Sequence, residues 1–82
     1  MGFHDPLLSV LQTRLPGLLY DWAPGGKIKG DEYWVKNPMR DDKRGTSFSV
    51  NIRTGCWKDF AVPGSQGRGN LISLYAGIHR IN

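Results

Sequence analysis

The side chains best suited to chemistry in this chain are a lone cysteine, two histidines and a pair of neighbouring acids. Cys56 could act with His4 or His79 as a nucleophile and its base, but nothing in their spacing supports such a pair. Asp41 and Asp42 could bind Mg²⁺, although two adjacent acids among basic residues usually belong to a solvated loop. We therefore expect no catalysis by this chain itself, while a longer parent protein could still be an enzyme.

A glycine-rich run at residues 64–69 invites comparison with nucleotide-binding loops. A Walker loop needs a Lys-Ser or Lys-Thr pair that does not follow here, and a dinucleotide fingerprint needs a parallel βαβ unit that the chain is too short to supply. The run does lead into Asn70 at a predicted helix N-terminus, where an anion such as phosphate could dock. We favour the simpler interpretation, a flexible connector.

Length and composition indicate one small domain. The 82 residues include three Trp, three Tyr and three Phe, whose large rings make a compact core possible at an apolar fraction of 39%. Cys56 is the only cysteine, which excludes an intrachain disulfide. No run approaches the roughly 20 apolar residues of a membrane span, and the N-terminus lacks the basic and apolar segments of a signal peptide. We expect a cytoplasmic protein with no membrane association.

The formal net charge of +4 suits a polyanionic partner. Basic and acidic residues are interleaved along the chain, however, and do not form a cluster in sequence. Charge alone therefore favours nucleic-acid binding only modestly over an ordinary solvated surface.

The first predicted element of the chain is an amphipathic helix over residues 5–15. Asp5 is a suitable N-cap, Pro6 suits the first helical position, and Pro16-Gly17 ends the helix. Its apolar stripe consists of Leu7, Leu8, Leu11 and Leu15. Such a stripe usually packs against the core; the alternative is a helix that binds a partner.

Two β-hairpins are expected next. Residues 27–29 and 32–36 flank a Gly-Asp pair, which is a good signal for a two-residue hairpin turn. Residues 47–52 alternate strictly between apolar and polar side chains and precede an Arg-Thr-Gly turn. Residues 56–60 form the returning strand.

A second helix is predicted over residues 71–78, with Asn70 as its N-cap. Its apolar face consists of Leu71, Leu74, Tyr75 and Ile78. The predicted fold class is therefore α+β: a small antiparallel sheet of about four strands in two hairpins, flanked by an N-terminal and a C-terminal helix.

Several short motifs occur in an order that resembles a known family. They are Tyr33-x-Val35-x-Asn37-Pro38, Asp41-Asp42-Lys43, Ser47-Phe48-Ser49-Val50, Gly55-x-Trp57-Lys58-x-Phe60 and Gly69-Asn70-Leu71-Ile72-Ser73-Leu74. Over residues 33–74 this pattern resembles the N-terminal zinc-ribbon domain of bacterial, phage and plasmid DNA primases, with one extra residue before Ser47. In that family a strand ends in Cys-Pro-x-His, and later motifs read Pro-Ser-Phe-Ser-Val, Lys-Cys-x-x-Cys and Gly-Asp.

The resemblance implies a zinc site whose ligands this chain lacks. Asn37 and Arg40 stand where the family has its first cysteine and its histidine, and Asp59 and Val62 stand at its last two cysteines. Arginine and valine cannot ligate zinc, and Cys56 lies three residues before the Asp59 position. We therefore expect a degenerate zinc ribbon with no metal or other cofactor. The side chains expected to fill the core in place of the metal are Trp34, Trp57 and Phe60.

In the family this domain contacts single-stranded template DNA, and the resemblance implies the same role and the same partner here. Single strands are held by aromatic faces that stack on bases and by cations that contact phosphates. The residues expected to bind the strand are Arg40, Lys43, Arg44, Arg53, Trp57, Lys58 and Arg68. Pattern alone leaves open whether Trp57 is exposed for stacking or buried in the core.

The competing interpretation is a protein-docking module. Loss of the metal ligands could accompany loss of DNA contact, leaving a domain that docks through its leucine-rich helix. Its partner would be the primase catalytic domain or the helicase domain of the same protein. Since the chain ends soon after its last predicted helix, we expect residues 1–82 to be one zinc-ribbon-like domain, the N-terminal part of a larger replication protein of a phage or plasmid.

Overall fold

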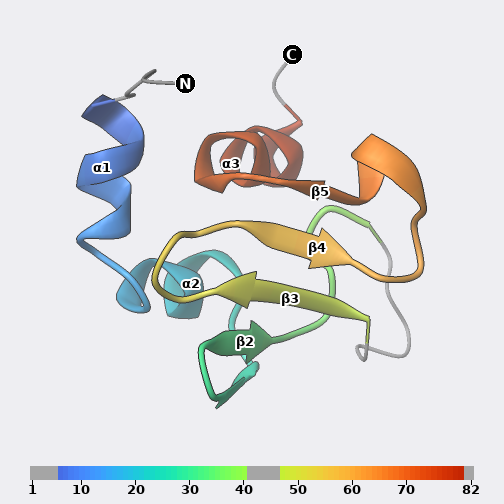
Figure 1. The fold of residues 1–82 in the computed structure, drawn as a ribbon, viewed down its shortest axis with the longest axis horizontal. Coiled ribbons are helices and arrows are strands. Elements are labelled where there is room, and N and C mark those ends of the chain that lie inside the picture. Colours follow the sequence, from blue (N-terminus) through green and yellow to red (C-terminus); the bar gives the residue numbers. More distant parts are fainter. Residues whose placement is uncertain (1–5, 41–46, 81–82) are drawn as a thin grey trace.

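The alternating segment predicted at residues 47–52 forms the central strand of a five-stranded antiparallel sheet (Figure 1). The structure is a computed structural model of the chain and describes residues 6–40 and 47–80. Within them, β3 (Phe48–Asn51) lies between β2 (Glu32–Trp34) and β4 (Trp57–Asp59). Both predicted hairpins are therefore confirmed, and the order of the strands in the sheet follows the chain.

The two outer strands are short. β1 (Lys27–Lys29) pairs with β2 at one edge and has three exposed residues, whereas β5 (Arg68–Gly69) pairs with β4 at the other edge. A 3₁₀ turn, η1 (Gly64–Gly67), leads into β5. The interpretation of residues 64–69 as a flexible connector is therefore wrong. Gly69 lies opposite Trp57, and a Cβ atom there would stand 2.8 Å from the indole ring, so the missing side chain lets the strands pair closely.

The N-terminal helix is shorter than predicted. α1 (Pro6–Gln12) ends before Thr13, whose hydroxyl donates a hydrogen bond of 2.6 Å to the carbonyl of Val10 and competes with further helical bonds. A second helix that the sequence pattern did not predict, α2 (Gly17–Trp22), follows directly. The predicted N-cap, Asp5, lies outside the described residues.

The C-terminal helix agrees closely with its prediction. α3 (Leu71–His79) begins at Asn70, whose side-chain oxygen accepts from the backbone N–H of Ser73 at 2.9 Å. The hydroxyl of Ser73 in turn accepts from the backbone N–H of Asn70, so the two residues form a reciprocal capping box. This cap fixes the start of the helix beside β5.

One core joins the helices to one face of the sheet. In Figure 1, α2 lies behind the strands and α3 lies alongside β4 and β5. The buried apolar residues are Leu19, Ala23, Tyr33, Val35, Phe48, Val50, Trp57, Leu71 and Leu74. Leu8, Leu11 and Leu15 of the predicted N-terminal stripe pack against this core, but Leu7 is 54% exposed. The fold class is α+β, as predicted, with one more strand and one more short helix.

Across residues 6–40 and 47–80, every helix is too short or too polar to cross a membrane.

Candidate nucleic-acid interface

The sheet has one face that the described helices leave uncovered, called here the open face. Residues paired across antiparallel strands project to the same side. Trp34 pairs with Ser49, Ser49 with Lys58, and Lys58 with Arg68, so these four residues form a row across strands β2 to β5. The opposite row, which includes Tyr33, Val50 and Trp57, faces the core.

An aromatic pair lies on the open face. The rings of Trp34 and Phe60 stack with centroids 5.9 Å apart and planes 22° from parallel, and Phe60 is 60% exposed. The Lys58 ammonium lies 4.8 Å from the centre of the Phe60 ring, within the range of a cation–π contact. Trp34 and Phe60 were expected in the core, and that expectation is wrong: in an alternating strand Trp34 must face away when Tyr33 faces inward.

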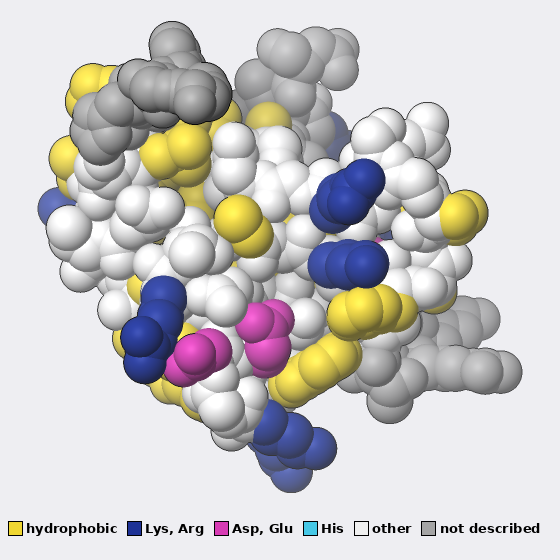
Figure 2. Space-filling view, in the orientation of Figure 1, with side chains coloured by type: hydrophobic (Ala, Val, Ile, Leu, Met, Phe, Trp, Pro, Cys, Tyr) yellow, Lys and Arg dark blue, Asp and Glu magenta, His cyan; other side chains and the backbone are white. Residues whose placement is uncertain are grey.

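Basic side chains adjoin this aromatic pair. Lys58 and Arg68 are neighbours across β4 and β5, and both are exposed. Together with Phe60 they border a hollow of about 320 Å³. Figure 2 shows basic side chains directly beside an apolar strip on this face, with acidic side chains at the far end of the strip. The open face therefore combines stacking surface with positive charge.

Trp57, by contrast, is not part of this surface. Only 6% of the residue is exposed, because Trp57 pairs with core-facing Val50 and packs against Phe48 with ring centroids 5.7 Å apart. Its indole N–H donates to the carbonyl of Asn70 at 2.9 Å. The prediction of Trp57 as a base-stacking residue is therefore wrong for this structure, and its burial is structural.

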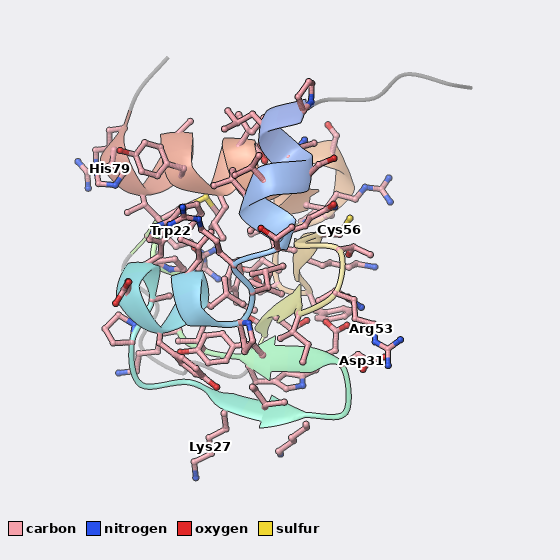
Figure 3. All side chains as sticks on the ribbon, turned by 90° about the vertical axis from the view of Figure 1, so that its left-hand side faces the viewer. Trp22, Lys27, Asp31, Arg53, Cys56 and His79 are labelled. Carbon is pink, nitrogen blue, oxygen red and sulfur yellow. The ribbon has the colours of Figure 1, made fainter. Side chains whose placement is uncertain are left out.

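The other predicted contact residues are scattered. Arg53 lies at the β3–β4 turn and pairs with Asp31 at 3.2 Å on the protein surface (Figure 3). Arg40 is bound to Asp59 at 2.9 Å. Lys43 and Arg44 lie outside the described residues. Of the predicted cations, the structure thus brings together Lys58 and Arg68.

A buried carboxylate organises the end of the sheet next to Phe60. Asp59 is 1% exposed, and its Oδ2 atom accepts from Asn37 Nδ2 at 2.8 Å and from Arg40 Nη2 at 2.9 Å. Its Oδ1 atom accepts from the Ser47 hydroxyl at 2.8 Å and from the Ala61 backbone N–H at 2.9 Å. This network joins the segment after β2 to the end of β4.

Hydrogen bonds determine the ionisation of this carboxylate. Burial alone would raise the pKa of Asp59, but hydrogen bonds from Asn37, the backbone of Ala61, Arg40 and Ser47 outweigh it and lower the pKa from 3.8 to about 2. Asp59 is therefore ionised throughout the physiological range.

The four positions that the primase resemblance assigns to zinc ligands lie together around Asp59. Asn37 and Arg40 bind its carboxylate, and the Val62 backbone N–H donates to its carbonyl at 3.0 Å. A guanidinium and a valine side chain cannot ligate zinc, so these residues do not fit the metal. Among the described residues, no three His, Cys, Asp or Glu side chains are grouped so as to hold a metal ion. An ionic hydrogen-bond network joins these positions.

The minimal nucleophile–base pair is not assembled either. Cys56 and His79 lie on opposite sides of the molecule in Figure 3, and His4 lies outside the described residues.

Neither a scan against protein-family models nor searches of curated proteins and of solved structures find a match to this chain.

Proposed function

We propose that this chain binds single-stranded DNA on the open face, as the template-binding domain of a phage or plasmid DNA primase or primase-helicase in the cytoplasm. The observation that carries the proposal is the stacked Trp34–Phe60 pair with Lys58 beside it. Exposed rings stack on unpaired bases, and adjacent cations contact phosphates.

The shape of the surface favours a single strand over a duplex. Strands of a sheet are about 4.8 Å apart, so the row from Trp34 to Arg68 spans about 15 Å, the length of a few nucleotides. A duplex presents its bases edge-on within grooves, where the flat Trp34–Phe60 pair could not stack on them. The open face is therefore suited to bases that are already unstacked.

The resemblance to the primase domain gains support from the Asp59 network. Motif order alone aligned Asn37, Arg40 and Asp59 with zinc ligands, and these three side chains are in hydrogen-bond contact although Asn37 and Asp59 are 22 residues apart. A shared metal site would require these positions to lie together, so their proximity supports the proposal.

The test is a titration of fluorescently labelled single-stranded and duplex DNA across a salt series. With two to three phosphates neutralised, log K should fall with log salt at a slope of about −1.4 to −2.1 for single strands, since each contact contributes about −0.7. Phe60→Ala should weaken binding by about 1–3 kcal/mol through lost stacking. Lys58→Ala should weaken binding and make the slope shallower by about 0.7.

Arg14→Ala is the matched control, because it removes the same charge from the exposed turn between α1 and α2. It should leave both the affinity and the salt slope nearly unchanged. Equal losses in Arg14→Ala and Lys58→Ala would show that only net charge matters, and absence of single-strand binding at low salt would refute the proposal.

A docking role is the second candidate, favoured by a separate apolar groove. Leu7, Leu11, Trp22, Ile72 and Tyr75 line a groove of about 220 Å³ between the helices. Leu7, on the α1 side of the groove, is 54% exposed. The partner of this groove would be the catalytic or helicase domain of the same protein, and a failure to bind DNA in the titration above would favour this function.

A further inference from the structure

Glu32 is an ordered carboxylate at one end of the aromatic pair. It precedes Trp34 by two residues on β2, so both side chains project from the open face, about 7 Å apart along the strand. Its Oε1 atom accepts from the Ser49 hydroxyl at 3.0 Å, and its Oε2 atom accepts from Asn51 Nδ2 at 3.0 Å. The two donors come from the neighbouring strand β3 and hold the carboxylate in one orientation.

Each oxygen of this carboxylate keeps capacity for another donor. A carboxylate has about four acceptor positions, and Ser49 and Asn51 use one on each oxygen. Pre-organised acceptors of this kind confer specificity, because no free energy is lost in orienting them when the ligand binds. Glu32 thus presents two oxygens beside a stacking surface, each with a remaining acceptor position.

The charges on the open face favour one way for a strand to lie across it. A phosphate next to this carboxylate would be repelled, whereas phosphates next to Lys58 and Arg68 are attracted. Lys29 pairs with Glu32 and Lys27 pairs with Trp34 across β1 and β2, so cations also lie on the β1 side of the aromatic pair. We place the backbone over Lys58 and Arg68, whose row across the sheet contains no carboxylate, and this placement points the bases toward β2. A base lying on the Trp34–Phe60 pair then directs its hydrogen-bonding edge at Glu32.

The nucleobases differ in what they offer to a pair of acceptors. Guanine carries its N1–H and N2–H₂ donors side by side on the Watson–Crick edge, where unpaired bases in single strands are recognised. Cytosine and adenine each carry one amino donor beside an acceptor nitrogen, and thymine carries one N–H between two carbonyls. A carboxylate can accept two bonds from guanine, one from cytosine or adenine, and is repelled by the carbonyls of thymine.

We propose that Glu32 makes the open face selective for guanine in single-stranded DNA, by accepting two hydrogen bonds from a base stacked on Trp34 and Phe60. This proposal rests on the proposed single-strand function and adds a specificity-determining residue to it. The expected order of affinity is guanine first, cytosine and adenine next, and thymine last.

The experiment measures binding of four labelled oligothymidines that differ only in a central guanine, cytosine, adenine or thymine. The wild-type protein should bind the guanine oligonucleotide about tenfold or more tightly than the all-thymine one, since a good bidentate contact discriminates between bases by that order. Glu32→Gln keeps the size of the side chain but replaces one acceptor by a donor, so the guanine preference should fall to about twofold or less. Affinity for the all-thymine oligonucleotide should hold or rise.

Asp31→Asn is the control, because it removes one negative charge from the adjacent residue, which is exposed and paired with Arg53. It should leave the order of bases unchanged. Equal affinity of the wild-type protein for all four oligonucleotides would overturn the Glu32 proposal. A guanine preference that persists in Glu32→Gln would overturn it too. Neither result would contradict the proposed binding of single strands. Failure of every oligonucleotide to bind would overturn both proposals together.

Discussion

Asp59 is one residue that links several segments of the chain. Its carboxylate accepts hydrogen bonds from the segment after β2, from the start of β3 and from the turn after β4. Hydrogen bonds to a charged group make a net contribution to stability of about 1.5–3 kcal/mol each. The lowered pKa of Asp59 shows that these hydrogen bonds stabilise the charged carboxylate more than its burial destabilises it.

This balance predicts a loss of stability in acid. The pKa of Asp59 is about 2 in the folded chain against an ordinary value of 3.8, which corresponds to about 2 kcal/mol of folding free energy. Because the folded-state pKa is depressed, this contribution is fully present above about pH 4 and disappears as the pH falls to about 2. Urea unfolding at about pH 5 and about pH 2 should show it in the wild type.

Asp59→Asn should abolish most of that pH-dependent difference and lower the stability at neutral pH by about 2 kcal/mol. Asp31→Asn serves as the control, since its exposed ion pair with Arg53 should contribute little. A pH dependence in Asp59→Asn equal to that of the wild type would place the acid-sensitive group elsewhere.

The position of the aromatic residues is partly predictable from residue pattern. Alternation at Phe48 and Val50 identifies the inward face of β3, and the register of the hairpin that follows places Trp57 opposite Val50. A residue opposite Val50 shares its inward direction, so hairpin register is the signal that assigns Trp57 to the core. The stacking of Trp34 on Phe60 is not predictable in this way, because it joins strand β2 to the end of β4 across the intervening β3.

At the scale of elements, a glycine next to β5 allows the chain to pack closely where this last strand joins the sheet. Gly67 precedes β5 at the end of η1, and a Cβ atom there would collide with the backbone carbonyl of Val62. Backbone cannot move aside as a flexible side chain can. The glycine-rich run is therefore a requirement of close packing, although its composition is typical of a connector.

Gly67→Ala should accordingly destabilise the fold by about 1–3 kcal/mol, the usual cost of overpacking. Gly17→Ala is the matched control: Gly17 lies in α2, no atom stands within 4 Å of an added Cβ, and alanine favours helix. Thermal unfolding of both variants tests the argument, and equal melting temperatures would contradict it.

The same elements explain why the prediction of the fold was incomplete. Strands β2, β3 and β4 carry alternating side chains, and α3 carries a capping residue, so sequence pattern identifies them. β5 has only Arg68 and Gly69 and no alternation to detect. α2 follows Pro16, and a Pro-Gly pair is typical of the end of helical structure, yet Leu19 of this helix is fully buried.

At the scale of the whole molecule, the two faces of the sheet differ in what lies on them. Helices cover one face of the sheet, and the other face carries aromatic and basic side chains together with Glu32 (Figures 1 and 2). The formal net charge of +4 is modest, so what distinguishes the open face is the juxtaposition of cations with stacked rings. Binding should depend on these local contacts more than on the total charge.

Stability should also be independent of metal ions. Since the ionic network around Asp59 joins the segments that a metal would join in a zinc ribbon, we expect the melting temperature to be the same in EDTA, in buffer and with equimolar zinc. Differential scanning fluorimetry measures all three. A melting temperature that falls in EDTA would show that a metal contributes to the folded state.

The two edges of the sheet bear on how copies of the protein behave at high concentration. An uncovered edge strand offers unpaired backbone groups that can template a strand from another copy and begin a fibril. β1 presents Lys27 and Lys29 on either side of Ile28, and β5 is only two residues long. Like charges would repel at the first edge, and the second is too short to propagate pairing. The edges of the sheet are thus protected against aggregation, although the described helices leave one of its faces uncovered.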